Sequence, residues 1–245
     1  DWHRHDEQRG SPHCNDFRVH FFRLPPYSNV RLSEEHKRFT TDSSSPPQEH
    51  AGRGRELLAA VAERQAALVA QWMLIGFIHG VMNTDNLSIL GLTIDYGPYG
   101  WIDNFDTHWT PNTTDAQTRR YRYGQQPAVA HWNLRALALA LEDVVPADAL
   151  ESALQVYVTT FQATHRDFTA RKLGLSAAEE LEDQLIQDLW SLLRRGGVDM
   201  ALFLRALADV DPASPEPEVL RGTFYADEQF VAEREALAGW LDRYA

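Results

Sequence analysis

The segment HGVMNTDNLSILGLTIDYG, residues 79–97, places oxygen-bearing side chains on either side of an alternating apolar run. Magnesium binds oxygen ligands, usually one or two carboxylates or amides completed by phosphates and water. Asn86 and Asp95 can supply two such ligands if the run between them folds back as a β-hairpin, since both then lie at its open end. We therefore predict a magnesium site here, with manganese as the alternative ion. Asp85 is a candidate base for an attacking hydroxyl.

The same spacing has a purely structural interpretation, in which the Asp and Asn side chains only cap turns. The resemblance to kinase-like phosphotransferases favours a catalytic role for these residues over turn capping. Their catalytic loop carries an Asp and a metal-binding Asn, and an Asp-Phe-Gly segment follows. Here His79, Gly80 and Asn86 match that loop, and Asp-Tyr-Gly begins at Asp95. Val81 stands where the catalytic Asp is expected, which disfavours ordinary phosphoryl transfer.

The segments QWMLIGFIHGVMNTDN, DYGPYGWIDNFD and QQPAVAHWNL resemble the selenoprotein O family of pseudokinases. The similarity is specific from about residue 64 to about residue 173 and looser as far as Tyr244. It implies a mainly α-helical fold, the C-terminal lobe of a protein-kinase-like domain, with a small β-hairpin that carries the metal site. It also implies a protein adenylyltransferase, which binds ATP and moves AMP to Ser, Thr or Tyr hydroxyls of proteins.

The resemblance also implies roles for single residues. Asp85 corresponds to the proton acceptor, and Asn86 and Asp95 correspond to the metal ligands. Asp95 is in addition an ATP contact. His79 matches the catalytic-loop histidine, for which we expect packing and hydrogen bonding rather than proton transfer.

Proteins of this family carry an N-terminal lobe with a glycine-rich phosphate loop and a paired lysine. Lys37 lies in the polar context EEHKRFT, and AGRGRE at 51–56 lacks the spacing of a phosphate loop. We therefore expect a truncated copy with reduced or no activity. The alternative is a non-catalytic helical module.

Residues 1–52 lack a sustained hydrophobic period and hold six of the ten histidines with scattered Arg, Pro and Ser. They are predicted to be irregular or disordered, and their composition suggests out-of-frame reading of GC-rich DNA as a hypothesis. Residues 53–245 form the predicted domain. Its expected helices are 53–75, 127–143, 146–173, 176–195, 198–209 and 226–244, and 97–125 is expected to be an ordered loop.

Ser176 and Glu179 have the spacing of a capping box at the start of the fourth of these helices. Four tryptophans within the domain are predicted to fill its core because they lie in apolar surroundings; they are Trp72, Trp101, Trp132 and Trp190.

Composition excludes several classes of function. The net charge is −12, and no Lys/Arg-rich run was found that could follow a phosphate backbone, so no nucleic-acid partner is expected. The single cysteine, Cys14, allows neither an intrachain disulfide nor a multi-cysteine zinc site. No apolar run approaches the roughly 20 residues that span a bilayer. We expect a cytoplasmic protein without a membrane partner.

Overall fold

The computed structural model describes residues 47–175 and 182–245. All of these belong to one compact unit, Pro46–Ala245. Most of the predicted irregular segment, and the predicted capping box at Ser176, lie outside the described residues.

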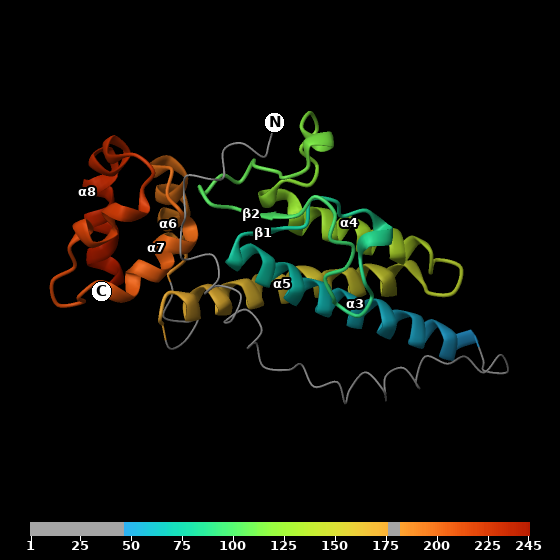
Figure 1. Cartoon of the computed structure of the whole chain (residues 1–245). Helices are drawn as coiled ribbons and strands as arrows, with labels where there is room; N and C mark the ends of the chain where they lie inside the picture. Colours follow the sequence, from blue (N-terminus) through green and yellow to red (C-terminus); the bar gives the residue numbers. More distant parts are fainter. Residues whose placement is uncertain (1–46, 176–181) are drawn as a thin grey trace. The chain divides into compact units, whose positions relative to one another are not determined.

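The described unit is mainly α-helical, as predicted (Figure 1). Its six α-helices are α3 (Pro47–Ile75), α4 (Gln126–Leu139), α5 (Ala147–Lys172), α6 (Asp183–Gly196), α7 (Met200–Ala206) and α8 (Asp227–Tyr244). The first helix thus begins at Pro47 rather than at residue 53. Its 3-10 helices are η3 (Thr84–Asn86), η4 (Thr113–Asp115), η5 (Tyr123–Gln125), η7 (Leu207–Asp209) and η8 (Pro217–Thr223).

The β-hairpin predicted between Leu87 and Ile94 does not form. Strands β1 (Phe77–Ile78) and β2 (Gly100–Trp101) instead pair antiparallel on either side of the whole motif, with Phe77 opposite Trp101. A hairpin needs an apolar face to pack against, whereas three of the apolar side chains between Leu87 and Ile94 are exposed. These are Ile89, Leu90 and Leu92. The predicted metal ligands therefore lie in a long loop closed by two paired residues on each side.

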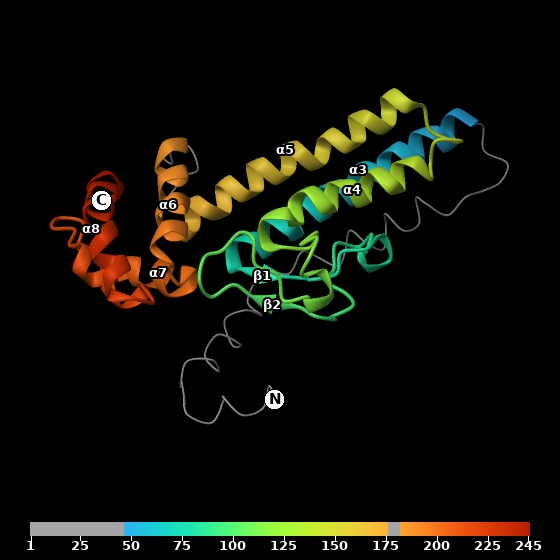
Figure 2. The same ribbon diagram turned by 90° about the horizontal axis from the view of Figure 1, so that it is seen from above.

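Helices α3, α4 and α5 lie side by side and support this loop (Figures 1 and 2). One hydrophobic core lies among them, with Leu58, Val69, Leu134 and Tyr157 among its buried residues. Strand β1 follows α3 directly because Gly76, at φ +71°, turns the chain out of the helix. The positions of the loop ends are therefore fixed by the helical core.

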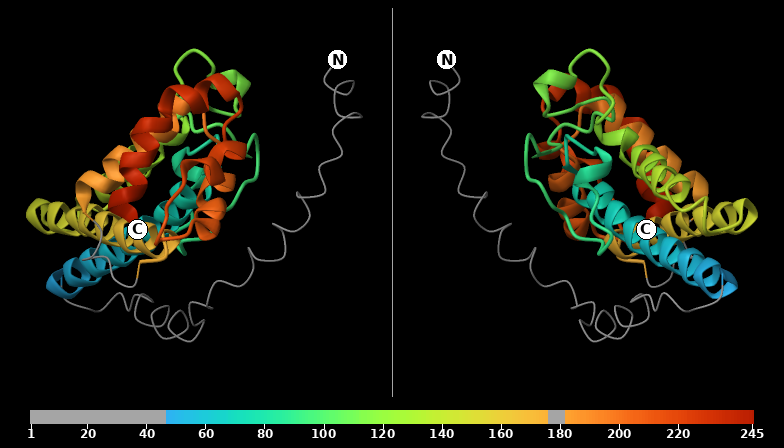
Figure 3. Two further views of the ribbon diagram at one scale, coloured as in Figure 1. Left: turned by 90° about the vertical axis from the view of Figure 1, so that its left-hand side faces the viewer. Right: turned by 90° about the vertical axis from the view of Figure 1, so that its right-hand side faces the viewer.

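A second core joins α6, α7 and α8 to the segment that follows β2. It includes Phe105, Leu189, Phe203 and Trp240. Viewed from the side of α8, that helix lies in front of α6 (Figure 3, left), and the two are in contact.

Local signals end or begin several of these helices. Gly174 and Gly197 take the left-handed conformation just beyond α5 and α6. Asp199 caps α7, its carboxylate accepting a hydrogen bond of 2.9 Å from the backbone N–H of Leu202. Pro127 occupies the first turn of α4, as predicted. Among the described helices, none is long and apolar enough to cross a membrane.

Two leucines of α4 test the first core. Leu134 is fully buried whereas Leu139 is 58% exposed. We expect Leu134→Ala to lower the free energy of unfolding by about 2–5 kcal/mol because it leaves a cavity. Leu139→Ala, the same change on the same helix, should alter it by about 0.5 kcal/mol or less. Urea unfolding followed by circular dichroism measures both, and equal losses would show that α4 does not pack as described.

Candidate active-site loop

The three predicted site residues lie in the loop between β1 and β2. Asp85 and Asn86 belong to η3, where Asp85 is exposed and Asn86 is half-buried. The Asn86 amide donates a hydrogen bond of 3.0 Å to the carbonyl of Val81. Asp95 is exposed and takes a left-handed backbone conformation at φ +53°. Such a conformation is uncommon for a residue other than glycine and is found repeatedly at functional sites.

His79 links the two halves of the loop. Its ring is buried, and Nε2 lies 2.8 Å from the carbonyl oxygen of Ile94, the residue before Asp95. A carbonyl can only accept, so Nε2 carries the proton. Nδ1 then accepts a longer bond, 3.4 Å, from the backbone N–H of Val81. His79 therefore has the hydrogen-bonding role expected of it, and it joins the segments that carry Asn86 and Asp95.

Buried side-chain amides hold the start of the loop. Gln126, at the beginning of α4, accepts from the N–H of His79 at 3.0 Å and donates to the carbonyl of Phe77 at 2.9 Å. Asn112 donates to the carbonyl of Gly80 at 3.0 Å. Each amide replaces a strand partner that the loop lacks, since buried backbone groups must be paired.

Three more side chains hold the middle and end of the loop. Asn133 of α4 donates to the carbonyl of Met82 at 3.0 Å. From α3, Gln65 donates to the carbonyl of Ser88 and Trp72 donates to the Thr93 hydroxyl, the latter at 3.1 Å. The loop is thus fixed from two helices that are far apart in the sequence.

The buried carboxylate of Asp115 fixes residues 115–121, which contact the loop through Tyr121 and are here called its rim. Asp115 accepts from the Thr118 hydroxyl and from the backbone N–H groups of Arg120 and Tyr121, the last at 2.7 Å. Burial raises the pKa of Asp115, but these hydrogen bonds outweigh it and hold the pKa below its usual range. Tyr121 in turn donates its hydroxyl hydrogen bond to Asn83, which precedes η3.

Gly80 is required where the loop crosses the segment after Asp95. It has φ +80°, and a Cβ at this position would lie 2.1 Å from the carbonyl oxygen of Pro98. Only glycine allows this approach and this conformation. The geometry of the matched catalytic-loop motif therefore depends on His79 and Gly80 together.

Comparison with known proteins decides the family. The family model described as protein adenylyltransferase SelO matches residues 33–245. The chain belongs to the SelO family. The match begins inside the segment predicted to be irregular and extends beyond the specific similarity found in the sequence.

SelO relatives in several bacteria share about half of the aligned residues. The protein nucleotidyltransferase YdiU of Xanthomonas campestris pv. campestris strain B100 is 51% identical over 199 residues, which are 79% of this chain and 38% of that protein. YdiU of Azoarcus sp. strain BH72 is 50% identical over 186 residues, 76% of this chain and 36% of the relative. The chain spans about two fifths of the length of these relatives.

Asn86 and Asp95, in the loop between β1 and β2, carry oxygen atoms of the kind that hard divalent cations bind. The Nδ2 group of Asn86 is held by Val81, which leaves Oδ1 as the available donor, and Asp95 offers a carboxylate at the surface. Within residues 47–175 and 182–245, no group of three or more His, Cys, Asp or Glu side chains could hold a metal ion. An amide oxygen and a carboxylate are the donor types that Mg²⁺ takes from proteins, and phosphates and water usually complete its coordination.

The residues that hold the loop were not identified from the sequence. Gln65, Asn112, Gln126 and Asn133 are all buried amides. A signal existed for Asn133, which interrupts the apolar run of α4 at a position on its buried face. Asp106, in contrast, caps a local turn by accepting a hydrogen bond from the backbone N–H of His108 at 2.8 Å.

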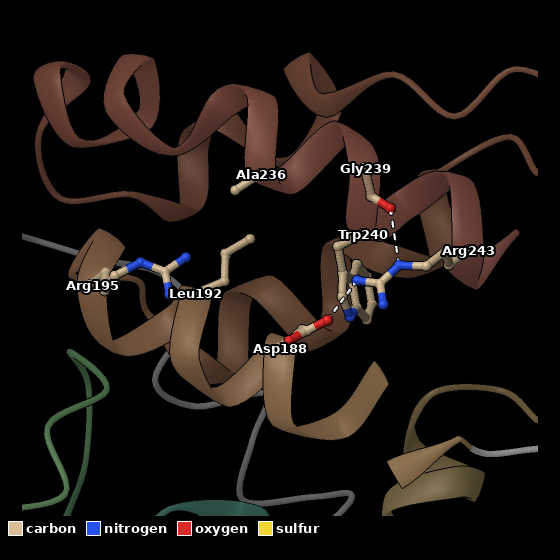
Figure 4. Close-up of a pocket in the computed structure, with 7 residues that line it drawn as sticks. All are labelled: Asp188, Leu192, Arg195, Ala236, Gly239, Trp240 and Arg243. Carbon is tan, nitrogen blue, oxygen red and sulfur yellow. Dashed lines mark hydrogen bonds and ion pairs between the residues drawn. The ribbon is translucent and has the colours of Figure 1, made fainter. Parts of the chain in front are cut away.

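Two hollows on the described part of the chain are not lined by the predicted site residues. One, of about 340 Å³, lies between α6 and α8 with Leu192, Ala236 and Trp240 on its walls (Figure 4). Its two arginines are paired, Arg195 with Glu233 and Arg243 with Asp188, each at 2.8 Å. We attribute this groove to helix packing because its polar groups bind one another.

The two loop glycines give a matched test. Gly80→Ala should lower the free energy of unfolding by about 1–3 kcal/mol, because alanine is strained in this backbone conformation. The contact of the new Cβ with Pro98 should lower it further. Gly97→Ala should change the free energy of unfolding by about 0.5 kcal/mol or less, since a Cβ there meets nothing within 4 Å. Thermal unfolding measures both, and a neutral Gly80→Ala would show that the loop crosses elsewhere.

The Asp115 carboxylate gives a pH test. Its folded-state pKa is lowered, so its contribution to stability is full above the unfolded pKa of about 3.9 and is lost as pH falls through the folded value. The stability difference between the parent chain and Asp115→Asn should therefore be greatest near neutral pH and shrink below about pH 4. Unfolding between pH 2 and 7 measures it, and a difference independent of pH contradicts the assignment.

Proposed function

We propose that this chain carries the catalytic loop of a protein adenylyltransferase that moves AMP from ATP to Ser, Thr or Tyr hydroxyls. The observation that carries the proposal is the position of Asp85. It is the sole carboxylate of residues 79–88, it is exposed, and it lies beside Asn86, whose amide is fixed. Position 81, where a kinase carries its base, holds Val81. SelO membership and the nucleotidyltransferase relatives support the reaction class.

In the proposed reaction the target hydroxyl oxygen attacks the α-phosphorus of ATP. The bond from that phosphorus to the oxygen bridging the α- and β-phosphates breaks, and pyrophosphate leaves. The hydroxyl proton passes to the Asp85 carboxylate, which acts as the base. Asn86 and Asp95 would hold magnesium, with manganese as the alternative ion, and the ion would neutralise charge on the triphosphate.

The tertiary contacts explain how the chain keeps these groups in place. Asp85 and Asp95 make no hydrogen bond through their carboxylates to other described residues, so both remain available to substrate and ion. The backbone on either side of them is held by His79 and by the Asn86 contact with Val81. Such prior positioning removes the cost of ordering the groups during reaction.

Labelled ATP tests the reaction. Incubation of the chain and a protein substrate with Mg²⁺ and ATP labelled on the α-phosphate should transfer label to protein, whereas γ-label should not be transferred. Asp85→Asn should reduce the transfer by on the order of 100-fold or more because the base is lost. Asp95→Ala should also weaken the stabilisation of the chain by Mg-ATP, measured by thermal shift.

Asp143→Asn is the control, because Asp143 is exposed in the turn after α4 and is remote from the loop in the sequence. It should leave transfer unchanged. Transfer of γ-label would indicate a kinase, and no transfer together with no stabilisation by ATP would indicate a non-catalytic helical module. Unchanged α-label transfer by Asp95→Ala would contradict the metal assignment.

A further inference from the structure

The rim of the candidate active-site loop carries a local excess of positive charge. Residues 116–141 contain no Asp or Glu, although the chain has 35 acidic residues and a net charge of −12. The same segment holds Arg119, Arg120, Arg122 and Arg135. It is the longest stretch of the sequence without an acidic residue, and its net charge is positive whereas that of the whole chain is negative.

An exposed tryptophan, Trp132, lies in this arginine-bearing segment. Trp132 was expected in the core, but it is 50% exposed, on the outer face of α4 with Arg135 one turn further along. The guanidinium of Arg120 lies over the Trp132 ring at 4.5 Å from its centroid and 5.8 Å from that of Tyr121. Such cation–π contact orients a guanidinium while leaving its hydrogen bond donors available.

Among the described residues, the interaction of these arginines with carboxylates is limited to that of Arg120 with Asp115. In the described part of the chain, the ion pairs of arginine involve other positions, and none includes Arg119, Arg120, Arg122 or Arg135. Asp115 faces Arg120 electrostatically, but its oxygens already accept from Thr118 and two backbone N–H groups. Arg122 is used locally, since it donates to Arg119 and Gln125.

The arrangement is connected directly to Asp85. Tyr121, beside Arg120 in sequence, donates to Asn83, and Asn83 precedes the 3-10 helix that carries Asp85. Asn133, beside Trp132 in sequence, holds Met82 of the same loop. A chain lying on this surface would therefore pass close to the proposed base.

We propose that Arg120, Tyr121, Trp132 and Arg135 form a docking surface, here called the arginine face, for an acidic segment next to the modified hydroxyl of the protein substrate. The proposal rests on the proposed function and adds the substrate class. Glu and Asp side chains pair with the arginine forks, and the exposed indole packs against apolar parts of the segment. Nucleic acid fits less well because a phosphate backbone needs an extended row of basic groups, and this surface comprises one loop and one turn of α4.

Peptide binding tests the arginine face without ATP or metal. The probe is a fluorescein-labelled dodecapeptide with a central Ser flanked by Glu and Asp, measured by fluorescence anisotropy on the full chain at low salt. The double variant Arg120→Glu with Arg135→Glu should weaken binding at least tenfold, and Trp132→Ala should weaken it several-fold. Binding should weaken as salt rises, and a peptide with Lys in the flanks should bind at least tenfold more weakly.

The matched control reverses the same amount of charge elsewhere. Arg55→Glu with Arg205→Glu changes exposed arginines on α3 and α7 and should leave peptide affinity unchanged. Equal weakening by both double variants would overturn the proposal, since net charge alone would then explain binding. A single-stranded dT12 that binds more tightly than the peptide, and is lost in the same double variant, would overturn the substrate class in favour of nucleic acid.

The two proposals can fail separately. Asp85→Asn should bind the acidic peptide at least as tightly as the parent chain, because it removes a negative charge near the arginine face. Peptide binding that depends on Arg120 and Arg135, without AMP transfer, would contradict the proposed function alone. AMP transfer with peptide binding indifferent to these arginines would contradict the arginine face alone.

Discussion

The need to pair buried backbone groups governs the loop between β1 and β2. Only two residues on each side form a ladder, so the remaining backbone groups must find partners elsewhere. In the first half of the loop, Gln126 accepts from the N–H of His79, and Asn112 and Asn133 donate to the carbonyls of Gly80 and Met82. His79 supplies the contact that joins this half to the residue before Asp95. The positions of the proposed catalytic groups follow from this pairing.

The side chains that hold the loop differ from those proposed to react. The groups that hold the loop are buried and come from α3, α4 and the segment before η4, whereas Asp85 and Asp95 are exposed on the loop itself. A buried hydrogen bond is not weakened by competing water, so the support is rigid. The exposed carboxylates keep their capacity to bind a proton, an ion or substrate.

Helix α4 contributes both to the support of the loop and to the proposed arginine face. Its inward residues Gln126 and Asn133 hold the loop, and its outward residues Trp132 and Arg135 form part of the arginine face. One helix of 14 residues thus relates the loop geometry to the surface on which a substrate segment is proposed to lie.

The sequence by itself determined the family, the helical character and the identity of the candidate site residues. Periodic apolar positions and terminal glycines such as Gly174 and Gly197 define helices through local interactions, which is why α5, α6 and α8 end close to the predicted positions. The motif residues Asp85, Asn86 and Asp95 could be recognised because their types and order suffice for a match. Only the tertiary structure decided how the loop folds: the alternation from Leu87 to Ile94 indicated strands, yet the described residues offer its exposed side chains Ile89, Leu90 and Leu92 no apolar face. It also decided that Trp101 and Trp132, both predicted to fill the core, are exposed, and that distant amides hold the loop. Side-chain exposure and long-range hydrogen bonds depend on which helices pack together.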